Sequence, residues 1–288
     1  MTKFKNWFVY IWLSIFFIAG FSLCAKSKKE TIRQRIVSLV PSVTEIIFAL
    51  GKDSLLVGNT IYCDYPEAAK HIYKVGDFSN PSLEKILRRK PSLVFATLPE
   101  QRNIIEQLKK HKIPVYVSQP KSVDSILSEI IEIGKLINAN DTAKALVNFL
   151  KSKLDEIAQR NPNFIDSPRV YIEISATPLM TVGSLSYIND LIRYAGAKNI
   201  FGDINQEYIV TNSEELIKRN PDMILILHPS VNKSQIRKRL GWSQMYAVKK
   251  GQIYDNLNPD YFFRPGPRFI YGVEDLANIV HGIWTKRK

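Results

Sequence analysis

Residues 82–97, "SLEKILRRKPSLVFAT", and residues 212–227, "NSEELIKRNPDMILIL", repeat one pattern about 130 positions apart. In each copy a Glu stands seven residues before a Pro, and an apolar run begins within two or three residues of that Pro. A short helix that leads into a buried strand is typical of sheets in which strands and helices alternate. The repeat therefore predicts two similar lobes of alternating strands and helices.

The segments around the first copy extend this alternation. The stretch "RIVSLVPSVTEIIFALG" (35–51) predicts a strand followed by a helix, and Ser42 and Glu45 have the spacing of a capping box at the helix start. The runs "LLVGNT" and "IPVYVS" predict further strands. Strands that alternate with helices pair in parallel, with the helices on the faces of the sheet.

Between the two copies the periodicity changes. Isoleucines and then leucines recur at helical spacing through nearly forty residues, with one break at "NAND". The stretch "RVYIEIS" then restarts the alternation, and a final helix is predicted near the C-terminus. We therefore divide the chain into an N-terminal α/β lobe at 35–121, a helical linker with an interlobe helix at 122–167, and a C-terminal α/β lobe at 168–288.

The N-terminus has the layout of an export signal. Two lysines precede an uncharged apolar stretch at 7–23, after which the chain turns abruptly polar. Cleavage after Ala25 would make residues 1–25 a signal peptide. Two alternatives stay open: Cys24 becomes the lipid-modified first residue of a lipoprotein, although Leu23 is bulky for that position, or the segment remains as a membrane anchor. All three place the folded part in the periplasm or elsewhere outside the cytoplasm.

The charge balance bears on partners. The 288 residues include 40 Lys and Arg against 27 Asp and Glu, and a balance of +13 can indicate affinity for nucleic acid or for a membrane surface. The basic residues are spread along the chain with only short clusters such as "KSKK" and "TKRK", so we predict no nucleic-acid partner. Cys63 is the one Cys left after cleavage, which excludes an intrachain disulfide.

No sequence motif predicts catalysis or metal binding. The four His are scattered, there is no Cys pair, and neither a Gly-x-Ser-x-Gly turn nor a glycine-rich phosphate loop occurs. We therefore predict no catalytic residue, no metal site, no cofactor and no enzymatic activity. Two other classes stay open: an exported enzyme whose residues are assembled only by the fold, and a chaperone-like or scaffolding surface protein.

Aromatic residues concentrate instead in predicted loops. Tyr62 follows the second predicted strand, and Phe78 and Tyr208 each stand six residues before the Glu of the repeated pattern, at matching places in the two lobes. The stretch "NPDYFFRPGPRF" crowds further aromatics before Arg264. Ligands of open parallel sheets bind outside the strand ends, where such loops lie. The two lobes are therefore predicted to offer flat surfaces to a ligand from both sides.

Five segments together identify a family. In order, "RIVSLVPSVTEIIFALG", "YCDYPEAAK", "SLEKILRRKPSLVFA", "TVGSLSYINDLIRYAGAKNIFGD" and "DYFFRPGPRF" resemble the substrate-binding proteins of ABC importers for cobalamin and iron complexes, most closely the cobalamin-binding branch. The resemblance runs from about residue 35 to the C-terminus. It implies an α/β fold of two Rossmann-like lobes bridged by a long α-helix, which permits only a small closure on the ligand.

The resemblance also implies a ligand and its contacts. The positions that match the corrin-contacting aromatics of the family are Tyr62, Phe78 and Tyr208, and Arg264 lies in the segment that closes the pocket. The helix start near Ser42 would supply hydrogen-bond donors to the peripheral amides of a corrinoid. The implied function is capture of cobalamin, or another corrinoid, for delivery to an importer.

Haem and a ferric siderophore remain the alternative ligands. Relatives in this family bind both, and Phe78 and Tyr208 stand where the cobalamin binder has Trp, so the surfaces offered to a corrin ring are smaller. Haem binders often place a Tyr, His or Met on the iron, and Tyr62, Tyr65 or Tyr208 could take that role.

The resemblance finally implies a partner. Glu84 and Glu214 match the two surface acids, one on each lobe, that meet Arg residues of the membrane permease in this family. A carboxylate near a helix start is favoured by the helix dipole, and a charge-assisted bond to guanidinium fixes orientation. The expected partners are the permease and ATPase of an ABC importer, and the binding protein itself is expected to be a monomer.

Overall fold

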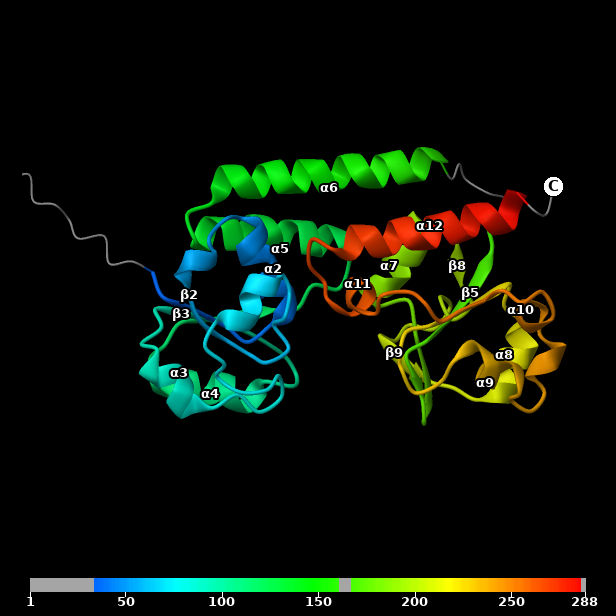
Figure 1. Ribbon diagram of the computed structural model, residues 1–288, viewed down its shortest axis with the longest axis horizontal. Coiled ribbons are helices and arrows are strands. Elements are labelled where there is room, and N and C mark those ends of the chain that lie inside the picture. Colours follow the sequence, from blue (N-terminus) through cyan, green and yellow to red (C-terminus); the bar gives the residue numbers. More distant parts are fainter. Residues whose placement is uncertain (1–33, 161–166, 286–288) are drawn as a thin grey trace, which may run out of the picture. The chain divides into compact units, whose positions relative to one another are not determined.

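The computed structural model describes residues 34–160 and 167–285 (Figure 1). The predicted signal peptide and Cys24 lie outside the described residues. Residues 34–288 form one compact unit, which contains two four-stranded parallel sheets flanked by helices. This arrangement confirms the predicted α/β fold of two Rossmann-like lobes with a long bridging helix. No helix of the described residues is both long enough and apolar enough to cross a membrane.

The first sheet has the strand order β2-β1-β3-β4, with every pair parallel. Apolar side chains fill its strands because helices cover both faces, as in other doubly wound sheets. The elements, in chain order, are β1 (Ile36–Ser38), α2 (Pro41–Ala49), η1 (Asp53–Leu55), β2 (Leu56–Asn59), η2 (Glu67–His71), α3 (Leu83–Arg88), β3 (Leu93–Thr97), α4 (Arg102–Lys110), β4 (Val115–Ser118) and α5 (Val123–Leu136).

The second sheet has the order β11-β10-β5-β8, again parallel. A small antiparallel sheet, β6-β7-β9, accompanies it and was not predicted from the sequence. The elements are β5 (Arg169–Glu173), β6 (Ser175–Ala176), β7 (Leu179–Val182), α7 (Tyr187–Tyr194), β8 (Lys198–Asn199), β9 (Tyr208–Val210), α8 (Ser213–Arg219), β10 (Met223–Ile226), α9 (Lys233–Arg237), η3 (Trp242–Gln244), α10 (Tyr246–Lys249), β11 (Ile253–Tyr254), α11 (Asp260–Phe263) and α12 (Phe269–Thr285).

Helix α6 (Asn140–Arg160) joins the two halves. It packs against α5, which contacts α2 of the first lobe, and against α7 and α12 of the second lobe, and it runs above both lobes in Figure 1. Its buried face, which includes Val147, Leu150 and Leu154, belongs to one hydrophobic cluster that also holds residues of both parallel sheets. The lobes are therefore connected by a shared apolar core as well as by the polypeptide segment that links them.

The repeated sequence pattern forms the same local structure in both lobes. The N-cap side chains Ser82 and Asn212 each accept a hydrogen bond from the backbone N–H three residues later, at the starts of α3 and α8. After each helix the chain turns through a left-handed residue, Lys90 with φ 46° and Asn220 with φ 44°. The repeat therefore extends from the N-cap to the turn before the inner strand.

The predicted capping box at the start of α2 is wrong. The N-cap is Val40, which makes no side-chain cap, and Pro41 is the first helical residue. Proline is favoured at the first helical position because it has no N–H to satisfy and its φ already suits a helix, so Pro41 rather than a capping side chain marks the start of this helix. Ser42 and Glu45 are instead buried; Ser42 lines the cavity described below, and Glu45 pairs with Arg264 of its wall.

Candidate functional site

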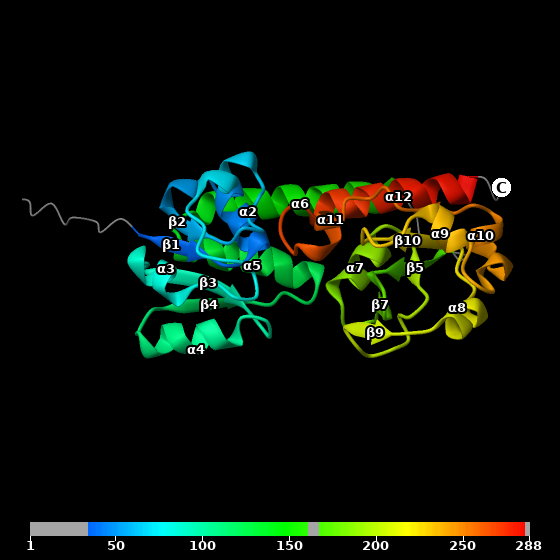
Figure 2. The same ribbon diagram turned by 60° about the horizontal axis from the view of Figure 1, so that its bottom comes forward.

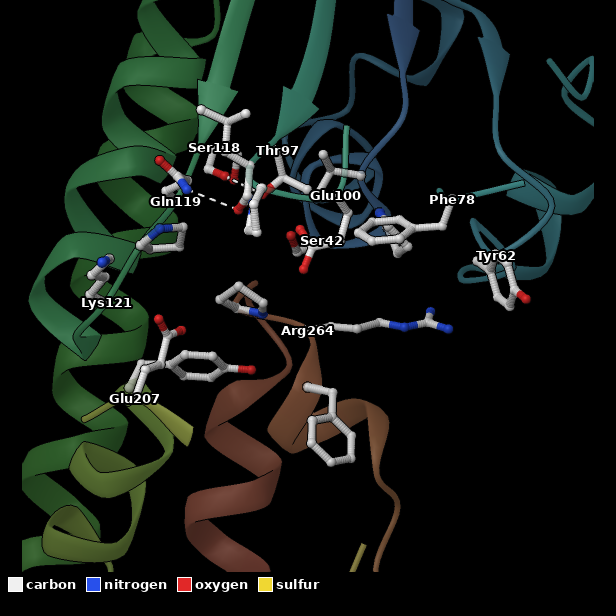
Figure 3. Close-up of a pocket in the computed structure, with 18 of the residues that line it drawn as sticks. Ser42, Tyr62, Phe78, Thr97, Glu100, Ser118, Gln119, Lys121, Glu207 and Arg264 are labelled. Carbon is white, nitrogen blue, oxygen red and sulfur yellow. Dashed lines mark hydrogen bonds between the residues drawn. The ribbon is translucent and has the colours of Figure 1, made fainter. Parts of the chain in front are cut away.

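A cavity of about 640 Å³ opens between the two lobes and is lined by residues of both (Figure 3). On the first lobe its wall is made by the segments that follow β1, β2, β3 and β4. The carboxyl ends of parallel strands meet at one edge of a sheet, where loops rather than helices form the surface. The topology of the first sheet therefore creates this wall.

Hydrogen bonds hold the two outer loops of this wall together. The hydroxyl Oγ1 of Thr97 donates to the carbonyl oxygen of Ser118 at 2.8 Å, and Nε2 of Gln119 donates to the carbonyl oxygen of Leu98 at 2.9 Å. Beneath them, the buried amide of Gln101 donates to the carbonyl oxygens of Leu39 and Phe78 at 3.1 and 2.8 Å. The loop that carries Phe78 is thus fixed to the loop after β3.

The five side chains predicted to bind the ligand all line this one cavity: Ser42, Tyr62, Phe78, Tyr208 and Arg264. Tyr62 is 54 % and Tyr208 45 % exposed, which leaves their rings accessible. Tyr208 is the first residue of β9, not part of a loop as predicted, because the short antiparallel sheet was not foreseen.

Other aromatic residues of the predicted loops have different positions. Phe263 also lines the cavity, whereas its neighbour Phe262 is fully buried in the core. Tyr65 is absent from the cavity wall, and its ring lies 3.9 Å from the guanidinium of Arg268. Sequence reasoning missed Tyr187, a buried residue at the start of α7 whose hydroxyl donates to the carbonyl oxygen of Phe262.

Arg264 pairs with carboxylates of both lobes, and its side chain extends toward Tyr62 in Figure 3. Its Nη1 lies 2.7 Å from Asp64 and 3.1 Å from Glu45, and its Nε lies 3.1 Å from Asp260. Burial alone opposes the charged form, but the hydrogen bonds and charges of these acids outweigh it and raise the pKa of Arg264. Likewise burial would raise the pKa of Asp64, yet the hydrogen bond and charge of Arg264 lower it.

Glu45 and Arg268 form a buried ion pair between the lobes. Nε of Arg268 donates to Oε2 of Glu45 at 2.8 Å, and the two side chains are 8 % and 2 % exposed. The Arg268 guanidinium also lies over two aromatic rings, 3.9 Å from the centre of the Tyr65 ring and 5.5 Å from that of Tyr261. These partners are more than 200 residues apart, so no local sequence pattern indicates the pairing.

The cavity wall holds more acidic than basic groups. Glu100, Glu207 and Asp260 face Lys121 and Arg264, and Figure 3 shows Lys121 and Glu207 at the end away from Tyr62. Burial and the nearby carboxylates Glu207 and Glu100 raise the pKa of Tyr208 to about 12. Since Arg264 is already paired with carboxylates, the wall carries a net negative charge.

Ser42 supplies a buried polar atom at the base of this wall. Its Oγ is buried and makes no hydrogen bond with the described residues. Gly266 approaches its backbone so closely that an added Cβ would lie 3.1 Å from the Ser42 carbonyl oxygen. A buried hydroxyl that makes no hydrogen bond destabilises the folded protein, so a hydrogen bond between this group and a bound ligand is favourable.

The two acids predicted to dock the permease lie outside the cavity. Glu84 and Glu214 are each the second residue of their helix, α3 and α8, and both side chains are exposed. Glu84 pairs with Arg88 one turn later at 2.6 Å. Both helices lie on the side of their lobe away from α6 (Figure 1).

The described residues contain no group of three or more His, Cys, Asp or Glu arranged to hold a metal ion.

Comparison of the sequence with models of protein families gives a family of binding proteins. The model of a family described as "Periplasmic binding protein" matches residues 36–258.

The chain belongs to the periplasmic binding protein family.

Sequence relatives within the periplasmic binding protein family are ABC transporter components. An uncharacterised ABC transporter substrate-binding lipoprotein of Bacillus subtilis, YvrC, is 36 % identical over 261 residues, 88 % of this chain and 81 % of its own. The vitamin B12-binding protein of Vibrio vulnificus is 26 % identical over 255 residues, 88 % of this chain and 92 % of its own. Members of this family bind substrates for ABC transporters, work with their permease and ATPase components, and are not enzymes.

Solved structures of the periplasmic binding protein family have the same fold. A possible iron-binding solute-binding protein of Staphylococcus epidermidis has a TM-score of 0.76 at 31 % identity, over 86 % of this chain and 98 % of its own. The haem-binding protein RhuT of Roseiflexus has a TM-score of 0.77 at 23 % identity, over 87 % and 98 %. The second likeness shows the fold alone.

Proposed function

We propose that this protein captures a cobalamin-type corrinoid in the interlobe cavity and delivers it to an ABC importer. The observation that carries the proposal is the convergence of Tyr62, Phe78 and Tyr208, from both lobes, on one cavity of about 640 Å³. A volume of this size is ordinary for small-molecule sites, and aromatic walls exclude water from a flat apolar ring. Hydroxyl, amide and carboxylate groups around the rings would meet peripheral amides.

The charge of the cavity wall favours a corrinoid over the alternative ligands. Haem carries two propionates and many ferric siderophores are anionic, so both are stabilised by basic sites. Here Arg264 is already paired with Asp64, Glu45 and Asp260, and Glu100 and Glu207 add negative charge. The amide side chains of a corrinoid are neutral, and they can donate hydrogen bonds to these carboxylates.

The choice of possible iron ligands also weighs against haem. His, Tyr, Met and Cys are the usual protein ligands of haem iron, and tyrosines alone represent them among the described residues of the wall: Tyr62, Tyr187 and Tyr208. Burial, the largest effect, and nearby groups raise the pKa of Tyr187 and Tyr208, which opposes formation of a phenolate ligand. The haem alternative therefore depends on Tyr62.

Delivery is assigned to Glu84 and Glu214. One exposed carboxylate on each lobe, at the same position of a repeated helix, would let two Arg residues of the permease contact both lobes at once. We propose that the chain acts outside the cytoplasm as a monomer without a resident cofactor, since the corrinoid is cargo. We propose lobes at 35–121 and 168–288, joined by the helical segment 122–167, with residues 1–25 as export signal or Cys24 as lipid anchor.

Three ligands added separately to the purified protein test the cargo. Cyanocobalamin, haemin and a ferric siderophore each absorb visible light, and a ligand that binds the folded state raises its melting temperature by mass action. We expect cyanocobalamin alone to raise the melting temperature and to shift its own spectrum. A haemin response that Tyr62→Phe abolishes would establish the haem alternative instead, and a siderophore response would establish the third.

A further inference from the structure

The net positive charge of residues 34–285 comes from two segments, one in each lobe. Residues 82–112, which include α3 and α4, contain eight Lys or Arg and three acids, and residues 212–251, from α8 to α10, contain the same numbers. The rest of 34–285 contains 15 basic and 20 acidic residues. The basic residues are therefore concentrated in these two segments and are not spread evenly along the chain as predicted.

Most of these basic side chains are exposed. On the first lobe the exposed ones are Lys85, Arg88, Lys90, Arg102, Lys109, Lys110 and Lys112. On the second lobe they are Lys218, Arg237, Lys238, Lys249 and Lys250, on α8, α9 and α10 and the turns beside them. We call these two groups the basic surfaces.

The helices of the basic surfaces other than α10 lie on the side of the protein away from α6 in Figure 1. In Figure 1 the helices α3, α4, α8 and α9 lie opposite α6, and α10 contacts η3, which α8 and α9 also contact. Glu84 and Glu214, on α3 and α8, belong to the same side. A partner that approaches these two acids therefore also approaches both basic surfaces.

One apolar side chain stands out within the second basic surface. Leu240, directly after Arg237, Lys238 and Arg239 in the turn beyond α9, is 95 % exposed, more than any other large hydrophobic residue of the described chain. Basic side chains around an exposed Leu are typical of segments that lie in the interface of an anionic bilayer, where the cations meet phosphate and the Leu enters the acyl region.

We infer that this side of the protein contacts an anionic phospholipid surface through the two basic surfaces and Leu240. The contact would orient Glu84 and Glu214 toward a membrane-embedded partner. The protein would then reach that partner by diffusing along the membrane surface and not through the surrounding solution. The inference rests on the proposed function only in placing the chain outside the cytoplasm beside a membrane. It does not depend on which cargo the cavity binds.

Vesicle binding tests the inference. The chain without residues 1–25, which leaves the whole described fold intact, is mixed with phosphatidylcholine vesicles with or without phosphatidylglycerol, and the bound fraction is measured by flotation. We expect binding only to the anionic vesicles, with a loss on raising the salt concentration. Reversal of Lys109, Lys110 and Lys112 to Glu, or of Arg237 and Lys238 to Glu, should lower the partition coefficient roughly tenfold or more.

Matched variants separate this contact from other effects. Lys144→Glu with Lys151→Glu, two exposed lysines of α6 on the opposite side, should lower binding by less than about threefold. Leu240→Ser should weaken binding severalfold without changing its salt dependence. Unchanged melting temperatures would show that each variant is folded. Failure of the wild type to bind anionic vesicles, or an equal loss in the α6 variant, would overturn the inference, whereas cyanocobalamin binding tests the cargo independently.

Discussion

At the scale of single residues, Glu45 is the carboxylate that ties the lobes together. It is buried, and it accepts hydrogen bonds from Arg264 and Arg268 of the other lobe. Removing one partner of a buried ion pair leaves an uncompensated charge, so Glu45→Gln should lower the free energy of unfolding by about 3 kcal/mol in urea titrations. Glu84→Gln breaks an exposed ion pair, so the free energy of unfolding of this variant should stay within about 1 kcal/mol of the wild-type value. Equal losses would contradict this role of Glu45.

The aromatic residues of the cavity should contribute individually to cargo affinity. If the rings of Phe78 and Tyr208 lie against a corrinoid, Phe78→Ala and Tyr208→Ala should each weaken binding by ~1 kcal/mol or more. Phe149 is exposed on α6, outside the cavity wall, so Phe149→Ala is the matched control. Titration followed by visible absorbance measures all three. Affinities unchanged in both cavity variants would remove these rings from the site.

Glu129, on α5 beside the cavity loop after β4, should make stability depend on pH. Burial and then the charge of Glu132, opposed by a hydrogen bond from Ser118, raise the pKa of Glu129 to about 7 from 4.5. The folded protein thus keeps a proton that the unfolded chain has lost in this range. Stability should therefore fall as pH rises from about 4.5 to about 7, by roughly 3 kcal/mol in all.

Urea unfolding of Glu129→Gln across the same pH range checks this dependence. The variant should lack the decrease and should be more stable than the wild type at pH values above 7. Glu106→Gln, at an exposed acid on α4, should keep the wild-type profile. Parallel profiles for the wild type and the Glu129 variant would show that the carboxyl titrates normally.

At the scale of elements, the two copies of the repeated pattern differ at the left-handed residue after the helix. Lys90 tolerates its positive φ poorly, so Lys90→Gly should raise the free energy of unfolding by about 0.5–1 kcal/mol. Asn220 accepts a hydrogen bond from the backbone N–H of Tyr246 at 2.7 Å, which glycine would lose. Asn220→Gly should therefore give no gain or a loss. Equal gains in urea titrations would contradict this account.

Long periodic segments were predictable and short ones were not. The sequence predicted α5, α6, the strands of the first parallel sheet, and β5 and β10 of the second, because each lies in an apolar or periodic run of several residues. The antiparallel sheet and β8 were missed because β6 and β8 have two residues each and β9 three, and, unlike β1, none of them lies in a longer apolar run. The capping box was wrong because a local rule competed with Pro41 and with tertiary partners of Glu45.

The candidate site divides in the same way. Phe78 and Tyr208 were predicted because they stand at matching positions in the two lobes, and Tyr62 because it follows a predicted strand and matches a ligand-contacting position of the family that the sequence resembles. The partners of Arg264 were not found, since Glu45 and Asp64 lie about 200 residues away and only folding brings them together. Ion pairs of such separation leave no spacing that a single sequence can reveal.

At the scale of the whole molecule, delivery requires both lobes to be recognised together. If Glu84 and Glu214 each pair with a permease Arg, Glu84→Lys and Glu214→Lys should each reduce corrinoid uptake roughly tenfold and the double variant should abolish it. Cyanocobalamin affinity should stay unchanged. Glu67→Lys, at another exposed acid of the first lobe, should transport normally. Normal uptake by the double variant would assign docking to other residues.

The 21 unbroken residues of α6, packed on both lobes, also govern how a bound molecule leaves. Wide opening needs a few pivot residues that absorb large backbone rotations, and a continuous helix provides none. It behaves as a stiff rod, and the elastic energy of a bend grows with the square of its angle. Unloading must then be driven from outside, by a transporter that strains this rod, and in its absence escape should be slow.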